Sequence, residues 1–448
     1  MSALTVESGT FTPLAESLAR LRTLVSPYCG LVRGVSDLTA APDDARLVRV
    51  GCRLADLEPL IGFSTDFRAG GSAPARDAAV AAALGEVAER YSASWIPDDL
   101  VLATAEELVG AVDPERFALF HPNQYERPSF PFKPFARDTR LLWTLGVELP
   151  SLEPAYLPAQ LVYLRWRSPV ETGEQPIGYS TSNGAACGAT FAEAVLRGLL
   201  ELVERDAFML SWYGRLSRPR LDSSSDLELA AFEERYFRPA GVRYQTVDLS
   251  AFHDVPTVVG VVRGRSGDGA PLAVGASAAQ TVSEAWKNAL AEAFAVRAWA
   301  RAMTHEGRTA AFAADFSDLD SFDDHILLYA SEEHARHADF LDGSPEVRAV
   351  GDVRPLEGTT VDDQIAALCE RLAASGVTAY AVDVTAPDIA AGGLRVAKVV
   401  APELQPLDVA YDARFLGGSR LYSAAFELGL AAAPATFDGL NPYPHPFP

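Results

Sequence analysis

The clearest pattern of hydrophobic and polar residues in this chain lies between residues 179 and 212. A strand-like or loop run is broken at Gly184 and again at Gly188, and Thr190 then stands three residues before Glu193, as in a helix-capping box. Apolar residues follow at the spacing of one helix face: Ala194, Leu196, Leu199, Leu200, Leu202 and Val203. The pattern predicts a long helix that starts near Thr190 and buries one face in the core.

The polar residues of this predicted helix carry candidate chemistry. Glu201 and Glu204 are three positions apart, so both carboxylates lie on one helix face, and Arg205 follows directly. Adjacent carboxylates repel each other unless a cation lies between them, and Mg²⁺ prefers oxygen ligands of this kind. For one such pair taken alone, a solvated acidic face is the simpler interpretation.

The same combination occurs twice more, which changes that interpretation. Both further segments are apolar and helix-forming, and each has a tryptophan shortly afterwards. They carry Glu86, Glu89 and Arg90 within residues 82–95, and Glu292 and Arg297 within residues 288–299. Helices that are otherwise buried do not need repeated glutamates for solubility. We therefore expect carboxylates and arginines from three parts of the chain to converge on one polyanion and its metal ions.

The remaining segments alternate between helical and strand periodicity without a regular β-α-β order. Helices are predicted at residues 14–24, 226–235 and 362–374, and strands within 27–54 and at 157–166, 242–249, 255–262 and 377–382. This mixture favours an α+β fold over a doubly wound parallel sheet. The three related glutamate helices suggest an internal pseudo-repeat, which would gather them around a shared cleft.

Composition narrows the class of protein. The chain has 448 residues, 48% of them hydrophobic, which is enough to bury a large core. Its formal net charge of -22 argues against binding to nucleic acid or to anionic membrane surfaces. Neither a membrane span nor a secretory signal is predicted. The four cysteines are widely spaced, which favours reduced thiols in the cytoplasm.

Lysine is scarce in this chain. Only Lys133, Lys287 and Lys398 occur, and none of them follows a glycine-rich loop. The sequence therefore contains neither the phosphate-binding loop of P-loop nucleotidases nor the glycine fingerprint of dinucleotide-binding folds. A bound nucleotide would depend instead on magnesium held by carboxylates and on arginine.

Three stretches together resemble the YcaO family: SNGAACGATFAEAVLRGLLELVERDAF at 182–208, ALGEVAERYS at 83–92 and NPYPHPFP at 441–448. More narrowly, they are similar to the azoline-forming cyclodehydratases of thiazole/oxazole-modified peptide biosynthesis. The resemblance covers most of the chain, from about Pro27 onwards. It implies an ATP-binding catalytic domain at residues 61–448 that ends in the proline-rich tail, with residues 1–60 as the N-terminal strand-rich segment of the same domain.

The resemblance also implies an ATP and Mg²⁺ site. The expected metal ligands, direct or through water, are Glu86, Glu89, Glu201, Glu204 and Glu292. The expected phosphate-facing residues are Arg90, Arg205 and Arg297, with Arg68 in place of a lysine that the family generally has. Asn183 and Gly184 would line the nucleoside. The chain also departs from the family's pattern at Ala82, where a serine is usual, and at Ala295, where a glutamine is usual.

The implied reaction is ATP-dependent cyclodehydration of a ribosomal precursor peptide. A Cys thiol or a Ser or Thr hydroxyl attacks the preceding amide carbonyl, and phosphorylation of the resulting oxyanion lets the amide oxygen leave as phosphate. The three helix segments contain no histidine that could act as the base. Four prolines at alternate positions stiffen the tail, which is expected to point into the site. There, His445 or the carboxylate of Pro448 would accept the proton of the nucleophile.

The sequence also leads to expectations about partners. Residues 1–60 lack the pattern of a peptide-recognition module, so a separate leader-peptide-binding protein is expected to present the precursor peptide. No flavin signature occurs, so oxidation of azoline to azole would fall to a flavin dehydrogenase of the same complex. The oligomeric state stays open, a homodimer included.

Two alternative functions remain. The first is a YcaO enzyme of another type, which would form thioamides or macroamidines at a similar ATP site. The second is a non-catalytic docking scaffold, which the departures at Arg68, Ala82 and Ala295 leave open.

Overall fold

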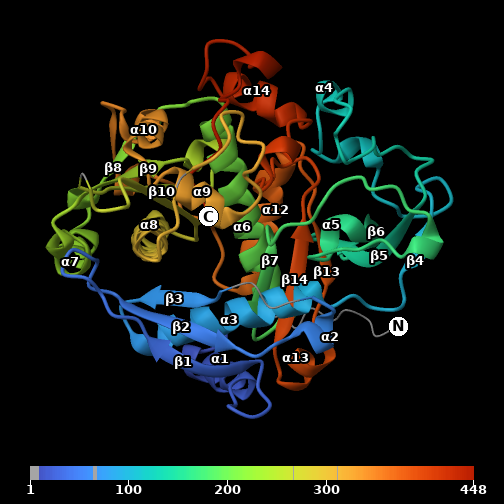
Figure 1. Ribbon diagram of the computed structural model, residues 1–448, viewed down its shortest axis with the longest axis horizontal. Helices are drawn as coiled ribbons and strands as arrows, with labels where there is room; N and C mark the ends of the chain where they lie inside the picture. The colour runs from blue at the N-terminus through green and yellow to red at the C-terminus, as the bar shows by residue number, and fades with distance from the viewer. Residues whose placement is uncertain (1–9, 64–67, 266, 310, 448) are drawn as a thin grey trace.

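The computed structural model describes residues 10–63, 68–265, 267–309 and 311–447. These residues form three mainly antiparallel sheets with helices packed on them, which confirms the predicted α+β fold. Figure 1 shows the long helix α6 (Phe191–Tyr213) at the centre of the molecule, with one sheet on either side of it and the third in the layer below.

The sheet of the lower layer is formed by the N-terminal part of the chain. Its strands are paired in the order β1-β2-β3, with bounds β1 (Val32–Asp37), β2 (Val48–Leu54) and β3 (Gly70–Ala73). The predicted strands within 27–54 are thus confirmed. Helix α3 (Arg76–Ser94) packs on β2 and β3, and α1 (Leu14–Leu21) packs on α3.

The two larger sheets flank α6. One has the order β4-β5-β13-β14-β7 with β6 added to β5, and its strands are β4 (Val101–Ala103), β5 (Leu141–Glu148), β6 (Pro154–Pro158), β7 (Ala185–Gly188), β13 (Tyr380–Asp383) and β14 (Arg395–Val400). The other has the order β11-β10-β9-β8-β12, and its strands are β8 (Arg220–Asp222), β9 (Arg243–Asp248), β10 (Thr257–Arg263), β11 (Leu272–Ala278) and β12 (Val347–Ala349). In the second sheet β12 pairs with β8 in parallel.

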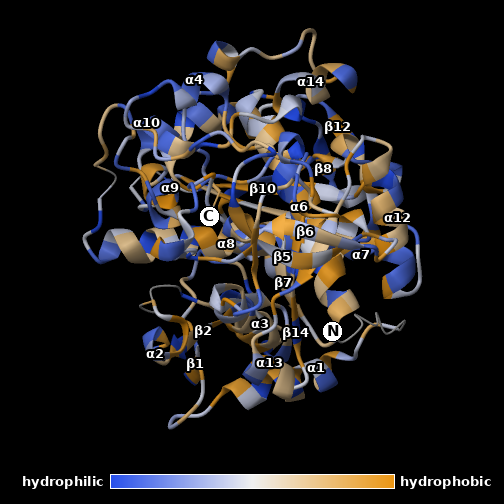
Figure 2. Ribbon diagram, turned by 90° about the vertical axis from the view of Figure 1, so that its right-hand side faces the viewer, coloured by the Kyte–Doolittle hydropathy of each residue, from blue (hydrophilic) through white to orange (hydrophobic). Residues whose placement is uncertain are grey.

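Each large sheet is covered by a long helix. Helix α6 packs on β7 and β14, α8 (Val282–His305) packs on β10 and β11, and α12 (Val361–Ala373) packs on α6. In Figure 2 the central strands are mostly orange, and much of the blue lies in the outer helices and loops. The other helices are α2 (Glu58–Ile61), α4 (Pro122–Tyr125), α5 (Ala159–Val162), α7 (Leu227–Tyr236), α9 (Phe322–Leu328), α10 (Glu332–Ala335), α11 (Asp339–Asp342), α13 (Pro387–Ala391) and α14 (Ser419–Glu427). Within the described residues, no helix has both the length and the hydrophobicity needed to cross a bilayer.

Helix α6 begins where the sequence predicts, because Thr190 accepts a hydrogen bond from the backbone N–H of Glu193 at 3.2 Å. The Glu193 carboxylate does not return to Thr190 as in a full capping box. It accepts instead from the N–H groups of Ala189, at 3.0 Å, and Thr12, at 2.5 Å. Glu193 therefore attaches the N-terminal segment to the start of α6.

Two glycines let α6 approach the preceding turn closely. Gly184 has φ +75°, and a Cβ atom there would lie 2.3 Å from the carbonyl oxygen of Val399. A Cβ atom on Gly198 of α6 would lie 2.6 Å from the carbonyl oxygen of Gly184. A larger residue at Gly184 would clash with the backbone of β14, and one at Gly198 would push α6 away from the turn. This close approach places the turn next to Glu201, one turn further along α6.

One predicted strand is shorter than expected. The run 157–166 continues as a strand only to Pro158, and α5 (Ala159–Val162) follows. Pro158 has no N–H group to donate to a further ladder, so strand pairing ends there. Gln160 of α5 then accepts a hydrogen bond from the N–H of Ile177, a local contact that the alternation of apolar residues did not reveal.

Candidate functional site

The structure brings the five predicted glutamates together. They come from three helices: Glu86 and Glu89 from α3, Glu201 and Glu204 from α6, and Glu292 from α8. A first cavity of about 660 Å³, between α1, α3, β7 and α6, is lined by Glu86, Glu89 and Glu201. A second cavity of about 480 Å³ shares Glu201 and is also lined by Glu204. We call these five residues the carboxylate cluster and the two cavities together the cleft.

Backbone N–H groups hold four members of the carboxylate cluster. Glu86 reaches β3, Glu201 reaches the turn before β7, and Glu204 and Glu292 both reach β11; in each case one carboxylate oxygen accepts the bond. The pairs are Gly70 to Glu86 at 3.0 Å, Gly184 to Glu201 at 3.2 Å, Ala278 to Glu204 at 3.3 Å and Ala276 to Glu292 at 2.7 Å. The three helices are thus fixed to three separate parts of the fold through the carboxylates themselves.

The carboxylate cluster is electrostatically strained without a cation. Burial, together with the charge of Glu201, raises the pKa of Glu89 well above its ordinary value. Burial and the charges of Glu292 and Glu201 raise the pKa of Glu204 to about 8. Burial likewise raises the pKa values of Glu201 and Glu292, although the charge of Arg205 opposes the shift. Because the oxygens are fixed and mutually repelling, the donor set fits a hard divalent cation such as Mg²⁺.

Arg205 is the arginine at the centre of the carboxylate cluster. Its guanidinium lies 3.4 Å from an oxygen of Glu201 and 3.4 Å from an oxygen of Glu204. Although the side chain is only 13% exposed, Nε and Nη1 have no hydrogen-bond partner in the described part of the chain. Buried donors without partners are costly, so this arginine fits an anionic ligand such as a phosphate group. Arg90 lies at the edge of the same group, 2.7 Å from Glu86.

Asn183 and Gly184 lie beside the cleft, but their visible contacts are structural. The side-chain amide of Asn183 is buried and donates to the carbonyl oxygen of Leu407 at 3.0 Å. Asn183 also lines a small, largely apolar cavity with Tyr179 and Phe415. The N–H of Gly184 is engaged by Glu201, as described above. The nucleoside contact expected of these two residues therefore remains a prediction.

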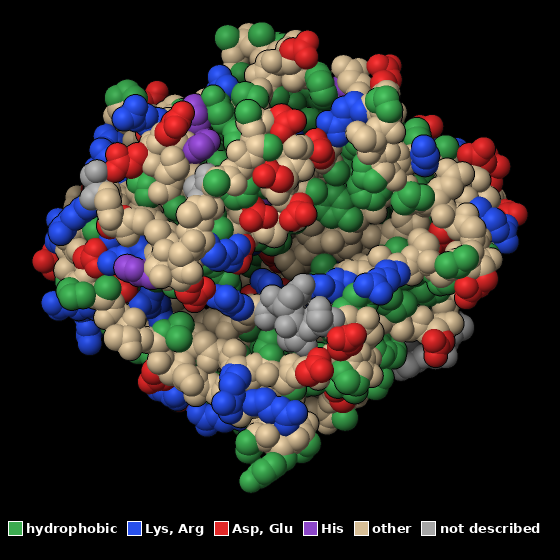
Figure 3. Space-filling view, in the orientation of Figure 1, with side chains coloured by type: hydrophobic (Ala, Val, Ile, Leu, Met, Phe, Trp, Pro, Cys, Tyr) green, Lys and Arg blue, Asp and Glu red, His purple; other side chains and the backbone are tan. Residues whose placement is uncertain are grey.

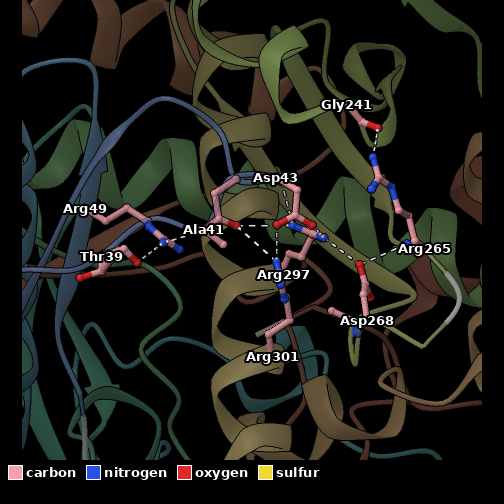
Figure 4. A network of polar contacts seen from close by, with 11 residues as sticks. Thr39, Ala41, Asp43, Arg49, Gly241, Arg265, Asp268, Arg297 and Arg301 are labelled. Atoms are coloured by element: carbon pink, nitrogen blue, oxygen red, sulfur yellow. Dashed lines mark hydrogen bonds and ion pairs between the residues drawn. The ribbon is translucent and has the colours of Figure 1, made fainter.

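Arg297 does not face the carboxylate cluster, contrary to the sequence-based prediction. It lies five residues after Glu292, which is about 140° further around a helix with 3.6 residues per turn. Its side chain is fully buried, 2.6 Å from Asp43 and 2.7 Å from Asp268. Figure 4 shows the two aspartates around the guanidinium, with Arg301 on the same helix also directed at Asp43. Arg297 thus attaches the connection between β1 and β2 to α8.

Arg68 is also away from the carboxylate cluster. The side chain is exposed, and its guanidinium carbon lies 5.2 Å from the ring centre of Trp299 on α8. It is not among the residues that line the cleft. A role of Arg68 at the phosphates would require this segment to move toward the cleft, so it stays a prediction.

The proline-rich tail runs along α6 toward the carboxylate cluster. The N–H of Asn441 donates to the carbonyl oxygen of Tyr213 at 2.9 Å, and the indole N–H of Trp212 donates to the carbonyl oxygen of Tyr443 at 3.0 Å. At its end, Phe447 is fully buried and its ring centre lies 4.2 Å from the guanidinium carbon of Arg205. The tail therefore reaches the cluster as the sequence predicts.

The prediction that His445 acts as a base does not agree with its contacts. Nε2 lies 2.7 Å from the carbonyl oxygen of Asp408, and Nδ1 accepts from the N–H of Phe447 at 3.3 Å. The ring stacks on His325 at 4.0 Å, and burial lowers the pKa of His445 well below its ordinary value. Both nitrogens are engaged, so His445 anchors the tail and presents no free lone pair to the cleft. Pro448, the other predicted base, lies outside the described residues.

Sequence reasoning missed a buried charged residue near the carboxylate cluster, besides Arg197, which lines both cavities of the cleft. Lys398 of β14 is 3% exposed, and its ammonium donates to the carbonyl oxygens of Thr181 and Asn183 at 2.6 Å each. Its charge acts on both Glu201 and Glu89. The available signal was a single lysine inside the apolar strand RVAKVV, in a chain with only three lysines.

The surface around the site is uneven in charge. Figure 3 shows a hollow near the centre of the face seen in Figure 1, above the layer that contains α3. Lys and Arg side chains border its lower edge, and several Asp and Glu side chains lie above it. A substrate approaching this face would meet both signs of charge.

The comparisons with known proteins agree with this geometry. A family model described as YcaO cyclodehydratase, ATP- and Mg²⁺-binding, matches residues 70–405, which is more than half of the chain. An uncharacterised protein of Methanothermobacter thermautotrophicus is 31% identical over 192 residues, 43% of this chain and 46% of the relative. An uncharacterised protein from the tfuA 3′ region of Rhizobium leguminosarum bv. trifolii is 31% identical over 196 residues, 42% of this chain and 43% of the relative. The match thus spans less than half the length of each relative.

Three solved structures have a similar fold. A heterocyclase in complex with substrate and cofactor has a TM-score of 0.80 at 24% identity, covering 100% of this chain and 59% of its own. The YcaO protein from Methanopyrus kandleri bound with AMPPCP and Mg²⁺ has a TM-score of 0.61 at 20% identity, and the match covers 90% of this chain and 94% of that protein. The Escherichia coli microcin synthetase McbBCD complex with pro-MccB17 bound has a TM-score of 0.55 at 13% identity, and the match covers 89% of this chain and 91% of the matched chain. At these identities the similarity concerns the fold.

Proposed function

The chain belongs to the YcaO family, and from this premise we propose that it is an ATP-dependent peptide cyclodehydratase. Its substrate would be a ribosomal precursor peptide, in which Cys, Ser or Thr residues are converted to azolines. The observation that carries the proposal is the gathering of glutamates from three helices around the cleft, with Arg205 between Glu201, Glu204 and the ring of Phe447 in the C-terminal tail.

The proposed chemistry solves a leaving-group problem. The side-chain thiol or hydroxyl of the peptide adds to the preceding amide carbonyl and generates a tetrahedral oxyanion, whose oxygen is a poor leaving group. ATP with Mg²⁺ supplies a phosphoryl group, so that this oxygen departs as phosphate and the C=N bond of the ring forms. The nucleophile loses one proton and the amide nitrogen loses another, so one water equivalent leaves the peptide for each ring.

The protein's own residues would position charge for this transfer. The carboxylate cluster would hold Mg²⁺, because backbone N–H groups fix four of its five glutamates and the carboxylates repel one another. Arg205 would neutralise phosphate with Nε and Nη1, which make no hydrogen bond within the described residues. Since Glu201 and Glu204 contact Arg205 and belong to the metal site, the cation and the guanidinium act on the same group of oxygens.

The tail would complete the site on the substrate side. Phe447 packs against Arg205, so the described part of the tail ends beside the carboxylate cluster. With both nitrogens of His445 engaged, the Pro448 carboxylate is the remaining candidate of the two predicted bases. We propose that it accepts the proton of the attacking thiol or hydroxyl.

A second protein would present the peptide. The microcin synthetase that shares this fold is a complex, and its precursor is bound within that complex. By analogy, a leader-peptide-binding protein would hold the precursor while its core enters the cleft. A flavin dehydrogenase that oxidises the azolines would be a further member of such a complex.

The function is tested with the full chain, a candidate leader-binding protein and a Cys/Ser/Thr-rich precursor peptide encoded near its gene. We expect loss of one water per modified residue, detected by mass spectrometry, only when ATP and Mg²⁺ are both present. A chelator or replacement of ATP by AMPPCP should stop the reaction. Ring formation without ATP, or incorporation of sulfur or an amine with no loss of water from the peptide side chain, would contradict it.

A further inference from the structure

Lys398 is a buried charge for which the proposed chemistry has no role so far. It lies in β14, paired with Ala185 of β7, and only 3% of its surface is exposed. Its neighbours Ala397 and Val399 are apolar and buried. A buried ammonium is costly unless its donors are satisfied, and a hydrophobic side chain would suit the strand better. A lysine at this position therefore calls for a physical explanation.

The ammonium contacts backbone rather than a carboxylate. Nζ donates to the carbonyl oxygens of Thr181 and Asn183 at 2.6 Å each, and within the described residues it has no ion pair. Burial lowers the pKa of Lys398 to about 8, and the charges of Glu201 and Glu89 act in the opposite direction. The positive charge thus lies beneath two members of the carboxylate cluster that come from different helices.

The two carbonyls belong to the turn that leads to Gly184. Gly184 follows Asn183 with φ +75°, and its own carbonyl oxygen accepts from the N–H of Val399 at 2.7 Å. Its N–H donates to Glu201 at 3.2 Å. Residues 398–399 of β14 therefore hold this turn at three carbonyl oxygens, those of Thr181, Asn183 and Gly184. The N–H of Gly184 then fixes the carboxylate of Glu201.

We propose that Lys398 is a positioning residue of the nucleotide site, which aims the N–H of Gly184 at Glu201 and places a positive charge beneath Glu89 and Glu201. The proposal rests on the proposed function, because it assumes that Glu201 holds Mg²⁺. A lysine that served only the fold would affect stability alone. A positioning lysine changes the affinity for the metal–nucleotide complex in protein that remains folded.

The decisive variant is Lys398→Met, which keeps the length of the side chain and removes its charge and both hydrogen bonds. Its Kd for Mg²⁺·AMPPCP, measured by calorimetry, should rise roughly tenfold, the effect of losing charged hydrogen bonds. Lys398→Arg keeps the charge and should recover most of this loss. Lys287→Met is the matched control, since Lys287 lies over the ring of Phe232 at 4.9 Å and does not line the cleft. Its Kd should equal that of the unmodified protein.

A double-mutant cycle with Glu201→Gln identifies the route of the effect. If Lys398 acts through Gly184 and Glu201, Lys398→Met should change Kd by less than about threefold once Glu201 is replaced. Equal effects of Lys398→Met in both backgrounds would overturn the proposal, as would an unchanged Kd in the folded single variant. Should Lys398→Met not fold, Lys398→Gln takes its place, because it also removes the charge. An unchanged Kd together with unchanged hydrogen exchange at the Gly184 amide in that variant would then overturn the proposal.

The same measurements separate this inference from the proposed function. Suppose that the unmodified protein binds Mg²⁺·AMPPCP, that Glu201→Gln weakens this binding and that Lys398→Met does not. In that case only the role of Lys398 is refuted. If the unmodified protein does not bind Mg²⁺·AMPPCP at all, the nucleotide site itself is refuted.

Discussion

The ring of Phe447 lies 4.2 Å from the guanidinium carbon of Arg205, so the C-terminal tail touches the arginine that pairs with Glu201 and Glu204. The contact joins residues more than 200 positions apart in sequence and connects the tail to the carboxylate cluster. A cation over an aromatic face is stabilised by about 1–2 kcal/mol when water is excluded, and both groups are nearly buried here. Tail position and arginine position are therefore coupled.

Phe447→Ala should lower the rate of ring formation by on the order of tenfold or more, because Arg205 loses the ring that supports it. It should also lower the free energy of unfolding by about 3–5 kcal/mol, since a fully buried phenylalanine leaves a cavity. Steady-state turnover of the precursor peptide and thermal unfolding measure the two effects.

The matched control for this variant is Phe426→Ala in α14, where the side chain is 46% exposed. It should leave both turnover and stability nearly unchanged. If Phe447→Ala turned over peptide at the normal rate while folded, the tail contact would have no part in the reaction.

A tag fused after Pro448 should abolish ring formation while Mg²⁺·AMPPCP still binds. Phe447 is fully buried, so added residues would have to pass through the site or pull the tail out of it. The fusion also converts the Pro448 carboxylate, which we propose as the base, into an amide that cannot accept the proton. The same tag fused to the N-terminus is the control, and it should permit normal turnover. Equal turnover of both fusions would contradict the role of the tail.

Glu204→Gln should stabilise the metal-free protein at alkaline pH. Burial raises the pKa of Glu204 from its ordinary value to about 8, so the folded state holds this proton more tightly than the unfolded state. The resulting stability is present below about pH 4.5 and is lost as pH rises through about 8. Near pH 9, the glutamine variant should therefore exceed the unmodified protein by on the order of a few kcal/mol in free energy of unfolding, since loss of the ion pair with Arg205 offsets part of the gain.

Denaturant titrations at acid and alkaline pH test this prediction, with Glu370→Gln at the exposed end of α12 as the control. The same Glu204→Gln substitution should weaken Mg²⁺·AMPPCP binding, because a metal ligand is lost. A variant that is less stable than the unmodified protein near pH 9 would show that Glu204 is not strained in the metal-free state.

The Arg297→Gln variant should have a lower free energy of unfolding than the unmodified protein but bind Mg²⁺·AMPPCP with the same affinity. The guanidinium is fully buried, and its removal takes one of two arginine partners from Asp43 and the arginine partner from Asp268, which costs about 3–5 kcal/mol. Burial alone would raise the pKa of Asp43, but the hydrogen bonds from Arg297 and Arg301 hold it well below its ordinary value. Calorimetry at a temperature where the variant is folded gives Kd, and thermal unfolding gives Tm.

Arg301→Gln is the companion variant, since this side chain is 22% exposed and contacts the same aspartate. It should lose less stability than Arg297→Gln. A large rise in Kd for Arg297→Gln would show instead that this arginine contributes to phosphate binding.

The sequence predicted the parts of the site that depend on local periodicity. Thr190 and the apolar stripe after it define α6, and the spacing of Glu201 and Glu204 places both on one face. The α+β class followed from the order of helical and strand segments. That the three glutamate helices would converge was an inference from their repeated pattern; in the structure Glu86 and Glu89 share a cavity with Glu201, and the charge of Glu292 acts on Glu204.

The errors arise where contacts link distant segments. Arg297 was expected at the phosphates because the family's pattern implies it, although helical geometry places it on another face than Glu292. Its partners Asp43 and Asp268 are 254 and 29 residues away in sequence. Lys398 was overlooked because its partners are backbone carbonyls 217 and 215 residues away, which have no sequence signature. Occupation of both nitrogens of His445 depends likewise on the backbone of Asp408, which no pattern of side chains reveals.

The central claim is that the peptide's amide oxygen leaves as phosphate, and the fate of that oxygen tests it most directly. A precursor peptide with heavy oxygen at the amide before the reacting residue is incubated with the protein, its partner, ATP and Mg²⁺, and the phosphate is analysed by mass spectrometry. The account predicts one labelled phosphate for each ring formed. Rings formed with the label in water, or retained in the peptide, would contradict it.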